Sequence, residues 1–437
     1  MLQKYFSAAT QIRSNETAAT LLSFGFVFCL MFAYNIMKPV RDGLPPNWTD
    51  AGLAWLWTYN FFFSIAAVSL YGYATSRIRL KFLIPGVYAF FALSFVLFYL
   101  GARTLEDAQF VNKSFYLWIS LFSLFHVSVF WSLMSDLFTK QQAPRLFGFI
   151  ASGASIGTMA GSAIAFWLSV RIGNLNLMLM AALVLVAIVP LVGVLYHLKA
   201  SRMPAPPGSA ANTTAISIGG NPFAGFREFI RNPFLLGIAF FIFLYTILGS
   251  FVYFEIKNLT VDGAELFGRT MDGDVRTQMW AGVNLIVNTI SIVVAMFATS
   301  RIAIHFGVAK TLALVPFVLA LVFLMVAFNP LLLVVLISHI VLKGGNYSIT
   351  RPAREMLYTL VNREDRFKAK PVIDIVVYRG GDTLAGWAFT AMTALFGFGI
   401  AGVAAVGAAV ALLWAVVGLG LGRSYDRSVA SADTPTA

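Results

Sequence analysis

The stretch Lys199-Ala-Ser-Arg-Met-Pro-Ala-Pro-Pro-Gly-Ser-Ala210, with Gly219-Gly-Asn-Pro222 a few residues later, decides the fold. The segment 199–233 is too polar, and too interrupted by proline and glycine, to cross a bilayer as a helix. It separates two long apolar regions, each with room for about six crossings of roughly 20 residues. We therefore predict an N-terminal half (1–198), a cytoplasmic linker loop (199–233), a C-terminal half (234–422) and a cytoplasmic tail (423–437).

The composition fixes the class of protein. Of the 437 residues, 59% are hydrophobic and only 11% are charged, whereas soluble domains carry about 25% charged residues. The apolar runs are continuous and about twice as long as the strands of a membrane barrel, so they predict helices. The fold class is an all-α integral membrane protein. Its twelve expected crossings are 20–42, 53–74, 82–101, 114–137, 145–170, 175–197, 234–254, 278–299, 309–328, 330–350, 371–395 and 399–422.

The distribution of charge gives the topology. The net charge is +12, and most lysines and arginines fall in connections that share one side of the membrane with the N-terminus. Because cytoplasmic loops retain such residues, we expect both termini in the cytoplasm and the protein in the cell inner membrane. The excess of positive charge is then topological, and nucleic acid is not an expected partner. The single cysteine, Cys29, excludes an intrachain disulfide, and we expect no metal and no cofactor.

Ionisable residues inside the first predicted crossing form one stripe. At 100° per residue, Tyr34, Asn35, Lys38, Arg41 and Asp42 lie on one face of a helix. Lys38 and Arg41 have the chemistry of a clamp for an anion, and Asp42 is a partner that would release them when the anion arrives. The alternative is that Arg41 and Asp42 anchor the helix in the headgroup region.

The tenth crossing repeats this pattern. Lys343, Asn346, Tyr347 and Arg354 follow helical spacing, and Arg351 lies close by in the sequence. Lys343 is about twelve residues into its crossing, or roughly 18 Å at 1.5 Å per residue. Because a lysine at that depth does not easily reach the interface, a functional role is favoured over an anchoring one.

The eleventh predicted crossing carries several ionisable side chains, and further candidate gating groups come from the first, fourth and tenth crossings. Asp374, Tyr378, Arg379 and Asp382 fall within a limited arc of one helix, and Asp382 has a depth similar to that of Lys343. A Lys343–Asp382 pair would be either a switch or a permanent structural ion pair. The predicted coupling or gating residues are Asp42, His126, Asp136, Glu355, Asp374 and Asp382. The predicted substrate-binding residues are Tyr34, Asn35, Lys38, Arg41, Lys343, Asn346, Tyr347, Arg351, Arg354, Tyr378 and Arg379.

Two resemblances follow from these segments. Six crossings, a polar loop and six more crossings resemble the layout of the major facilitator superfamily. The stretches Arg351-Pro-Ala-Arg-Glu-Met-Leu-Tyr358 and Lys368-Ala-Lys-Pro-Val-Ile-Asp-Ile-Val-Val-Tyr-Arg379, with Lys38-Pro-Val-Arg-Asp42, resemble the ATP:ADP antiporter family of plastids and intracellular bacteria. That resemblance implies a facilitator fold and exchange of nucleotides without hydrolysis. It places Arg41 and Arg354 where the family has lysines implicated in transport, and it matches Asp42, Glu355, Asp374 and Arg379 to shared positions.

The leading functional hypothesis is a secondary transporter for an anionic, phosphorylated, nucleotide-like metabolite. It would work by alternating access and exchange, as a monomer in the lipid bilayer, with the charged residues of the first, tenth and eleventh crossings facing a common aqueous chamber. One alternative is a proton-coupled exporter of a drug-like or amphiphilic compound, with Asp136, Asp382 or His126 carrying the proton. Another is a sensor or scaffold without transport activity. The sequence has no phosphate-binding loop, zinc-protease motif or nucleophile elbow, so an enzyme is not expected.

Overall fold

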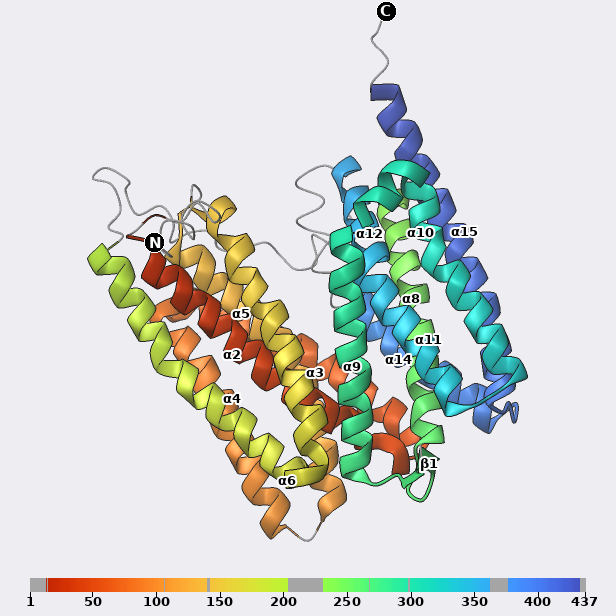
Figure 1. Ribbon diagram of the computed structural model, residues 1–437, viewed down its shortest axis with the longest axis horizontal. Helices are drawn as coiled ribbons and strands as arrows, with labels where there is room; N and C mark the ends of the chain where they lie inside the picture. The colour runs from red at the N-terminus through yellow and green to blue at the C-terminus, as the bar shows by residue number, and fades with distance from the viewer. Residues whose placement is uncertain are drawn as a thin grey trace, which may run out of the picture. The chain divides into compact units, whose positions relative to one another are not determined.

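The computed structural model describes residues 13, 15–105, 107–139, 142–202, 231–266, 268–297, 299–361 and 376–432. Helices dominate these ranges (Figure 1), which confirms the predicted fold class. The described strands are the two-residue β1 (Glu265–Leu266) and β2 (Arg269–Thr270), an antiparallel hairpin in which Glu265 pairs with Thr270.

The helices of the N-terminal half agree with the predicted crossings. They are α2 (Thr17–Asp42), α3 (Asp50–Arg77), α4 (Leu80–Thr104), α5 (Ala108–Leu137) and α6 (Ala143–Arg202), with a short 3-10 turn, η1 (Pro45–Asn47), after α2. The 60-residue α6 is interrupted at Gly173, whose φ of 78° and ψ of 161° are not helical. A positive φ is readily adopted by glycine alone, so the two predicted crossings 145–170 and 175–197 meet at this residue.

The helices of the C-terminal half are more irregular. They are α8 (Pro233–Leu259), α9 (Gly273–Phe297), α10 (Thr299–Phe328), α11 (Leu332–Gly345), a π-helical turn η3 (Asn346–Thr350), α12 (Arg351–Leu357), a 3-10 turn η4 (Tyr358–Leu360), α14 (Tyr378–Ala394) and α15 (Ile400–Ala432). In α10 the backbone breaks at Gly307, with φ 76°. The start of α8 is fixed by Asn232, whose Oδ1 accepts hydrogen bonds from the N–H groups of Phe234 and Leu235.

Ten stretches within the described ranges are long and apolar enough to span a membrane. One of them, Arg145–Ser201, has 57 residues and is broken at Gly173, so it supplies two crossings. The 17-residue α14 lies within the predicted crossing 371–395. The protein is therefore a multi-pass membrane protein.

The chain forms two compact units, each described by itself. Unit 1 comprises residues 1–44, 63–219 and 271–285, and unit 2 comprises residues 45–62, 220–270 and 286–437. The helices α3 and α9 each contribute residues to both units.

Unit 1 is held together by close packing of α2 on α6. Gly153, Gly157 and Gly161 form a row on α6, and an added Cβ on any of them would collide with the backbone of α2. At Gly153 it would lie 2.7 Å from the carbonyl oxygen of Phe24. Small residues spaced by four allow two membrane helices to approach closely, so this row has a structural role.

Unit 2 has its tightest packing between α10 and α15. An added Cβ at Gly422 would collide with the backbone of Ala309, and one at Gly407 would lie 2.7 Å from the ring of Phe323. The large fully buried rings Phe241, Phe254, Phe389 and Trp414 fill the space around α8.

Candidate functional site

In unit 1 the end of α2 holds a cluster of three charged side chains. Lys38 Nζ donates to Asp42 Oδ2 at 3.1 Å, across one helical turn. Arg41 donates to the other oxygen, Oδ1, from Nε at 2.9 Å and from Nη2 at 2.5 Å. Asp42 is only 3% exposed in its side chain, while Lys38 is 24% exposed and Arg41 is 15% exposed. One buried carboxylate thus accepts hydrogen bonds from two cations.

Neighbouring helices hold the two cations in place. Lys38 Nζ also donates to Asn284 Oδ1 of α9 at 2.8 Å. Arg41 Nη1 donates to Ser120 Oγ at 3.3 Å, and its guanidinium lies 5.4 Å from the ring centre of Tyr116 on α5. Pro39 lies within the same turn and removes one backbone donor, but α2 continues through it to Asp42.

Two further predicted residues of α2 diverge from this cluster. The ring of Tyr34 lies 4.3 Å, centre to centre, from that of His126 on α5. His126 is buried, and within the described ranges its Nε2 has no hydrogen-bond partner. Asn35 faces α6, where its Nδ2 donates to Met31 O at 2.8 Å and to Thr158 Oγ1 at 3.3 Å.

Unit 2 contains a second cluster of buried polar side chains, which begins with Lys343 on α11. Its Nζ lies 3.1 Å from the hydroxyl oxygen of Tyr245 on α8 and 5.0 Å from the centre of the same ring. The Tyr245 ring meets the Tyr378 ring edge to face, with centres 6.3 Å apart. This hydrogen-bond partner of Lys343, Tyr245, was not among the residues predicted from the sequence.

Arg354 completes this second cluster. It is only 5% exposed, and its Nη1 donates to the Tyr378 hydroxyl at 2.8 Å, while Nη2 is 3.4 Å from Glu355 Oε1. Its Nε has no hydrogen-bond partner among the described residues. The structure thus connects Lys343 to Arg354 through Tyr245 and Tyr378, with one side chain each from α11, α8, α14 and α12.

A change of helix type precedes Arg354. The π-helical turn η3 separates α11 from α12, and such turns are frequent at functional sites. Asn346 is buried in this turn, while Tyr347 is 45% exposed. A Cβ at the preceding Gly345 would lie 2.7 Å from Val315 on α10, so a glycine is needed for that contact.

The remaining predicted residues make none of the hydrogen bonds described for the two clusters. Arg351 is exposed, and Arg379 and Asp382 are half-buried on α14. Asp136 lies near the end of α5, where its Oδ2 is 3.9 Å from Lys199 Nζ and its backbone carbonyl also accepts from that lysine. Asp374 lies outside the described residues.

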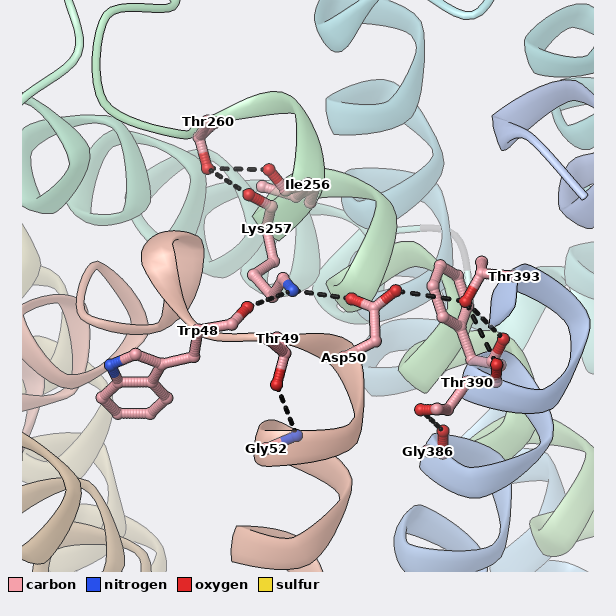
Figure 2. Close-up of polar contacts among 11 residues, drawn as sticks. Trp48, Thr49, Asp50, Gly52, Ile256, Lys257, Thr260, Gly386, Thr390 and Thr393 are labelled. Carbon is pink, nitrogen blue, oxygen red and sulfur yellow. Dashed lines mark hydrogen bonds and ion pairs between the residues drawn. The ribbon is translucent and has the colours of Figure 1, made fainter. Parts of the chain in front are cut away.

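A third polar network, in unit 2, was missed by the sequence analysis (Figure 2). Lys257, near the end of α8, is 4% exposed and donates to Asp50 Oδ1 at 2.6 Å and to the Trp48 carbonyl at 2.7 Å. Thr393 of α14 donates to Asp50 Oδ2 at 3.2 Å. Lys257 falls outside the predicted crossing 234–254, and hydropathy alone marked it as a loop residue. The signal that it belongs to the helix is the lack of a helix-breaking residue before Gly263.

Unit 2 also contains an apolar groove of about 610 Å³. Residues of α3, α8 and α14 line it, among them Phe61, Phe240, Phe243 and Gly380. Its walls offer almost no polar groups, so it suits a hydrocarbon surface and not a charged one.

Buried lysine, arginine and tyrosine side chains within apolar crossings mark a functional site inside a membrane protein. The chain belongs to the Major Facilitator Superfamily, which it matches over residues 17–362. It is therefore a transporter and not an enzyme. The match is to the superfamily as a whole, so kinship with the ATP:ADP antiporters stays a prediction.

Solved structures of facilitator transporters have the same fold. The nucleoside transporter NupG aligns with a TM-score of 0.63 at 14% identity, over 94% of this chain and 99% of that one. An auto-inhibited POT family peptide transporter aligns with a TM-score of 0.63 at 13% identity, over 93% and 97% of the two chains. A bacterial homologue of the human lysosomal transporter Spinster gives 0.57 at 12% identity, over 95% and 97%. No curated protein matches the sequence significantly.

Proposed function

We propose that the protein is a secondary transporter that exchanges an anionic, phosphorylated metabolite of the nucleotide type across the inner membrane. It would act by alternating access, with both termini in the cytoplasm. The proposal rests on the charge chemistry of the two clusters and on the resemblance of residues 351–379 to the ATP:ADP antiporters.

The observation that carries the proposal is the sharing of Asp42 by Lys38 and Arg41. A pair of opposite charges would be neutral and would need no ligand. Lys38, Arg41 and Asp42 together carry two positive charges and one negative charge, and lysine and arginine side chains are suited to bind an incoming anion. Both cations keep some exposure while Asp42 has almost none, so an arriving anion meets the cations first.

The cluster around Lys343 and Arg354 suits a phosphate group and an organic ring. Lysine and arginine donate several hydrogen bonds to phosphate oxygens. Tyr245 and Tyr378 add hydroxyl groups next to each cation, and tyrosine rings can stack on a base or a sugar. The half-exposed Tyr347 on η3 is the third ring in this region.

Exchange follows from the same electrostatics. An empty carrier must keep its buried lysines and arginines in a site of low polarity while it changes conformation. A bound anion neutralises them, so the loaded carrier reorients at lower cost than the empty one. A carrier that returns efficiently only when loaded exchanges one anion for another.

The test is counterflow in proteoliposomes that are preloaded with ATP, ADP, inorganic phosphate or a sugar phosphate. We expect labelled ATP or a related phosphate to accumulate only when an unlabelled phosphate compound is inside. Lys38→Gln and Lys343→Gln should each reduce this uptake at least tenfold, and Lys310→Gln, at an exposed lysine on α10, serves as the matched control. Equal uptake by all three variants would refute the role of the buried lysines.

The apolar groove supports a second candidate, proton-coupled export of an amphiphilic compound. A groove of about 610 Å³ with aromatic walls fits the hydrocarbon part of such a compound better than a nucleotide. If no phosphate compound exchanges, and an imposed proton gradient drives an amphiphilic dye out of the vesicles, this candidate replaces the first.

A further inference from the structure

One buried carboxyl group has no part in the clusters described above. Glu255 lies on α8 with an exposed fraction of 0%. Neither of its carboxyl oxygens has a hydrogen-bond partner within the described ranges. The predicted crossing ended at residue 254, but α8 continues to Leu259 and encloses Glu255.

The ionisable groups on the surrounding helices do not bond to Glu255. The elements that pack most extensively on α8 are α11, α14, α15 and η1, and α3 contacts it through Asp50 and through the Trp57 ring, which meets Tyr253 and Phe254. The ionisable residues of α11 are His339 and Lys343, and Lys343 donates a hydrogen bond to Tyr245. On α14 they are Tyr378, Arg379 and Asp382, whereas α15 has none between Ile400 and Gly422.

The remaining charged neighbours belong to the network of Figure 2. Lys257, two residues along α8, is engaged by Asp50 and by the Trp48 carbonyl. Residues two apart on a helix point away from each other, so Lys257 does not serve Glu255. The tyrosines of α8 are Tyr245 and Tyr253, and neither is a hydrogen-bond partner of Glu255. The same-face neighbours Phe251 and Val252 are buried and apolar.

An ionised carboxylate without hydrogen bonds or a counter-charge is very unfavourable in such a place, whereas the neutral acid is tolerated. We propose that Glu255 is a proton-binding site of the transporter. The carboxylate takes a proton from water to become the acid in the conformation seen here, and it returns that proton when the conformation changes. Glu255 lies four residues from the end of α8, or about 6 Å along the helix axis, so the proton has a short path to the polar segment after Leu259.

This inference goes beyond anion exchange because it adds the proton as a second ligand. It rests on the proposed function only for its effect on flux, since proton binding to Glu255 can be measured without a substrate. The two tests below therefore fail separately.

The first test is infrared spectroscopy of the purified protein in lipid, titrated with alkali. A protonated carboxyl group without a hydrogen-bond partner absorbs at a distinct C=O stretching frequency. We expect this band at neutral pH in the wild type and in Glu265→Gln, which alters an exposed glutamate on β1. It should be missing in Glu255→Gln, and it should disappear reversibly as the pH of the wild-type sample rises. Absence of the band, or a band that no pH removes, would overturn the proposal.

The second test is counterflow of labelled ATP at a series of pH values. The wild type and Glu265→Gln should show a rate that changes at least threefold with pH. Glu255→Gln, which imitates the neutral acid, should keep a rate that no longer responds to pH. An unchanged pH dependence in Glu255→Gln would contradict coupling through this residue, whereas absence of counterflow in the wild type would count against the proposed substrate and leave the infrared result standing.

Discussion

Arg354 and Tyr378 are joined by a hydrogen bond of 2.8 Å from the guanidinium Nη1 to the phenol oxygen. Arg354 is 5% exposed, so the phenol replaces water that the buried cation has lost. The same phenol ring contacts Tyr245, which is the partner of Lys343. A change at Tyr378 therefore reaches both cations of the second cluster.

We expect Tyr378→Phe to destabilise the protein by about 1–3 kcal/mol, because a buried guanidinium donor is left without its acceptor. Anion transport should fall as well, since the position of Arg354 is no longer fixed. Thermal unfolding in detergent and counterflow in vesicles measure the two effects. Tyr59→Phe is the control, since Tyr59 is 50% exposed, and its effect should stay within about 0.5 kcal/mol. Equal effects at both positions would show that the hydrogen bond is unimportant.

Asp42→Asn is expected to alter binding and turnover in opposite ways. Without the carboxylate, Lys38 and Arg41 lose the charge that competes with an incoming anion. The apparent affinity for the anionic substrate should rise, and the maximal rate should fall because release becomes slower. The concentration dependence of counterflow measures both quantities. A lower affinity together with a lower rate would indicate that Asp42 only supports the fold.

Removing Asp50 and removing Lys257 should destabilise the protein by different amounts. Lys257 is 4% exposed in its side chain and Asp50 is 18% exposed. Asp50→Asn leaves a buried ammonium group without its counter-charge, and breaking a buried pair in this way costs about 3–5 kcal/mol. Lys257→Met leaves a carboxylate that still has the Thr393 hydroxyl and partial access to water, so the loss should be smaller.

Thermal unfolding of the two single variants and the double variant tests this order. The double variant should be no less stable than Asp50→Asn alone, because the unpaired ammonium is then also removed. A larger loss for Lys257→Met than for Asp50→Asn would show that the contacts of the lysine chain matter more than its charge.

The sequence predicted the crossings well because the bilayer thickness sets the length of an apolar run. It also predicted the contact of Lys38 with Asp42, since residues four apart on a helix are neighbours. It did not identify Tyr245 as the partner of Lys343, because the two residues are far apart in the chain and meet only after α8 packs on α11. Glu255 and Lys257 were missed for a different reason. Hydropathy ends a crossing at the first charged residues, while α8 continues through them to Leu259.

The carboxyl group of the ion pair at the start of α2 lies outside the predicted membrane crossings, and it should make the stability of the fold depend on pH. Glu16 is 2% exposed and accepts hydrogen bonds from Arg145 at 3.0 Å and from Gln142 at 3.0 Å. Burial alone would raise the pKa of the Glu16 carboxyl, but the hydrogen bonds from Arg145 and Gln142 outweigh it and hold that pKa below its ordinary value.

A carboxyl whose pKa is lower in the folded state stabilises the fold above its unfolded pKa of about 4.3. That stabilisation is lost as the pH falls through the lower, folded pKa. We expect Glu16→Gln to unfold at a lower temperature than the wild type at pH 7, with a difference that shrinks as the pH approaches the folded value. Glu265→Gln should follow the wild type throughout. A difference that is independent of pH would mean that packing, and not the charge, accounts for the effect.

The packing of α2 on α6 gives the sharpest comparison, because α6 offers a matched control. A Cβ at Gly157 would overlap the carbonyl oxygen of Phe28, whereas a Cβ at Gly193 would meet nothing within 4 Å. Gly157→Ala must push α2 away from α6 and should cost about 1–3 kcal/mol, with further loss for Gly157→Val. Gly193→Ala should leave stability unchanged or raise it by up to about 1 kcal/mol, since alanine favours a helix. The unfolding temperatures of the two alanine variants test this prediction. Similar values would mean that α2 and α6 can separate at Gly157 without cost. The glycine row would then not hold unit 1 together.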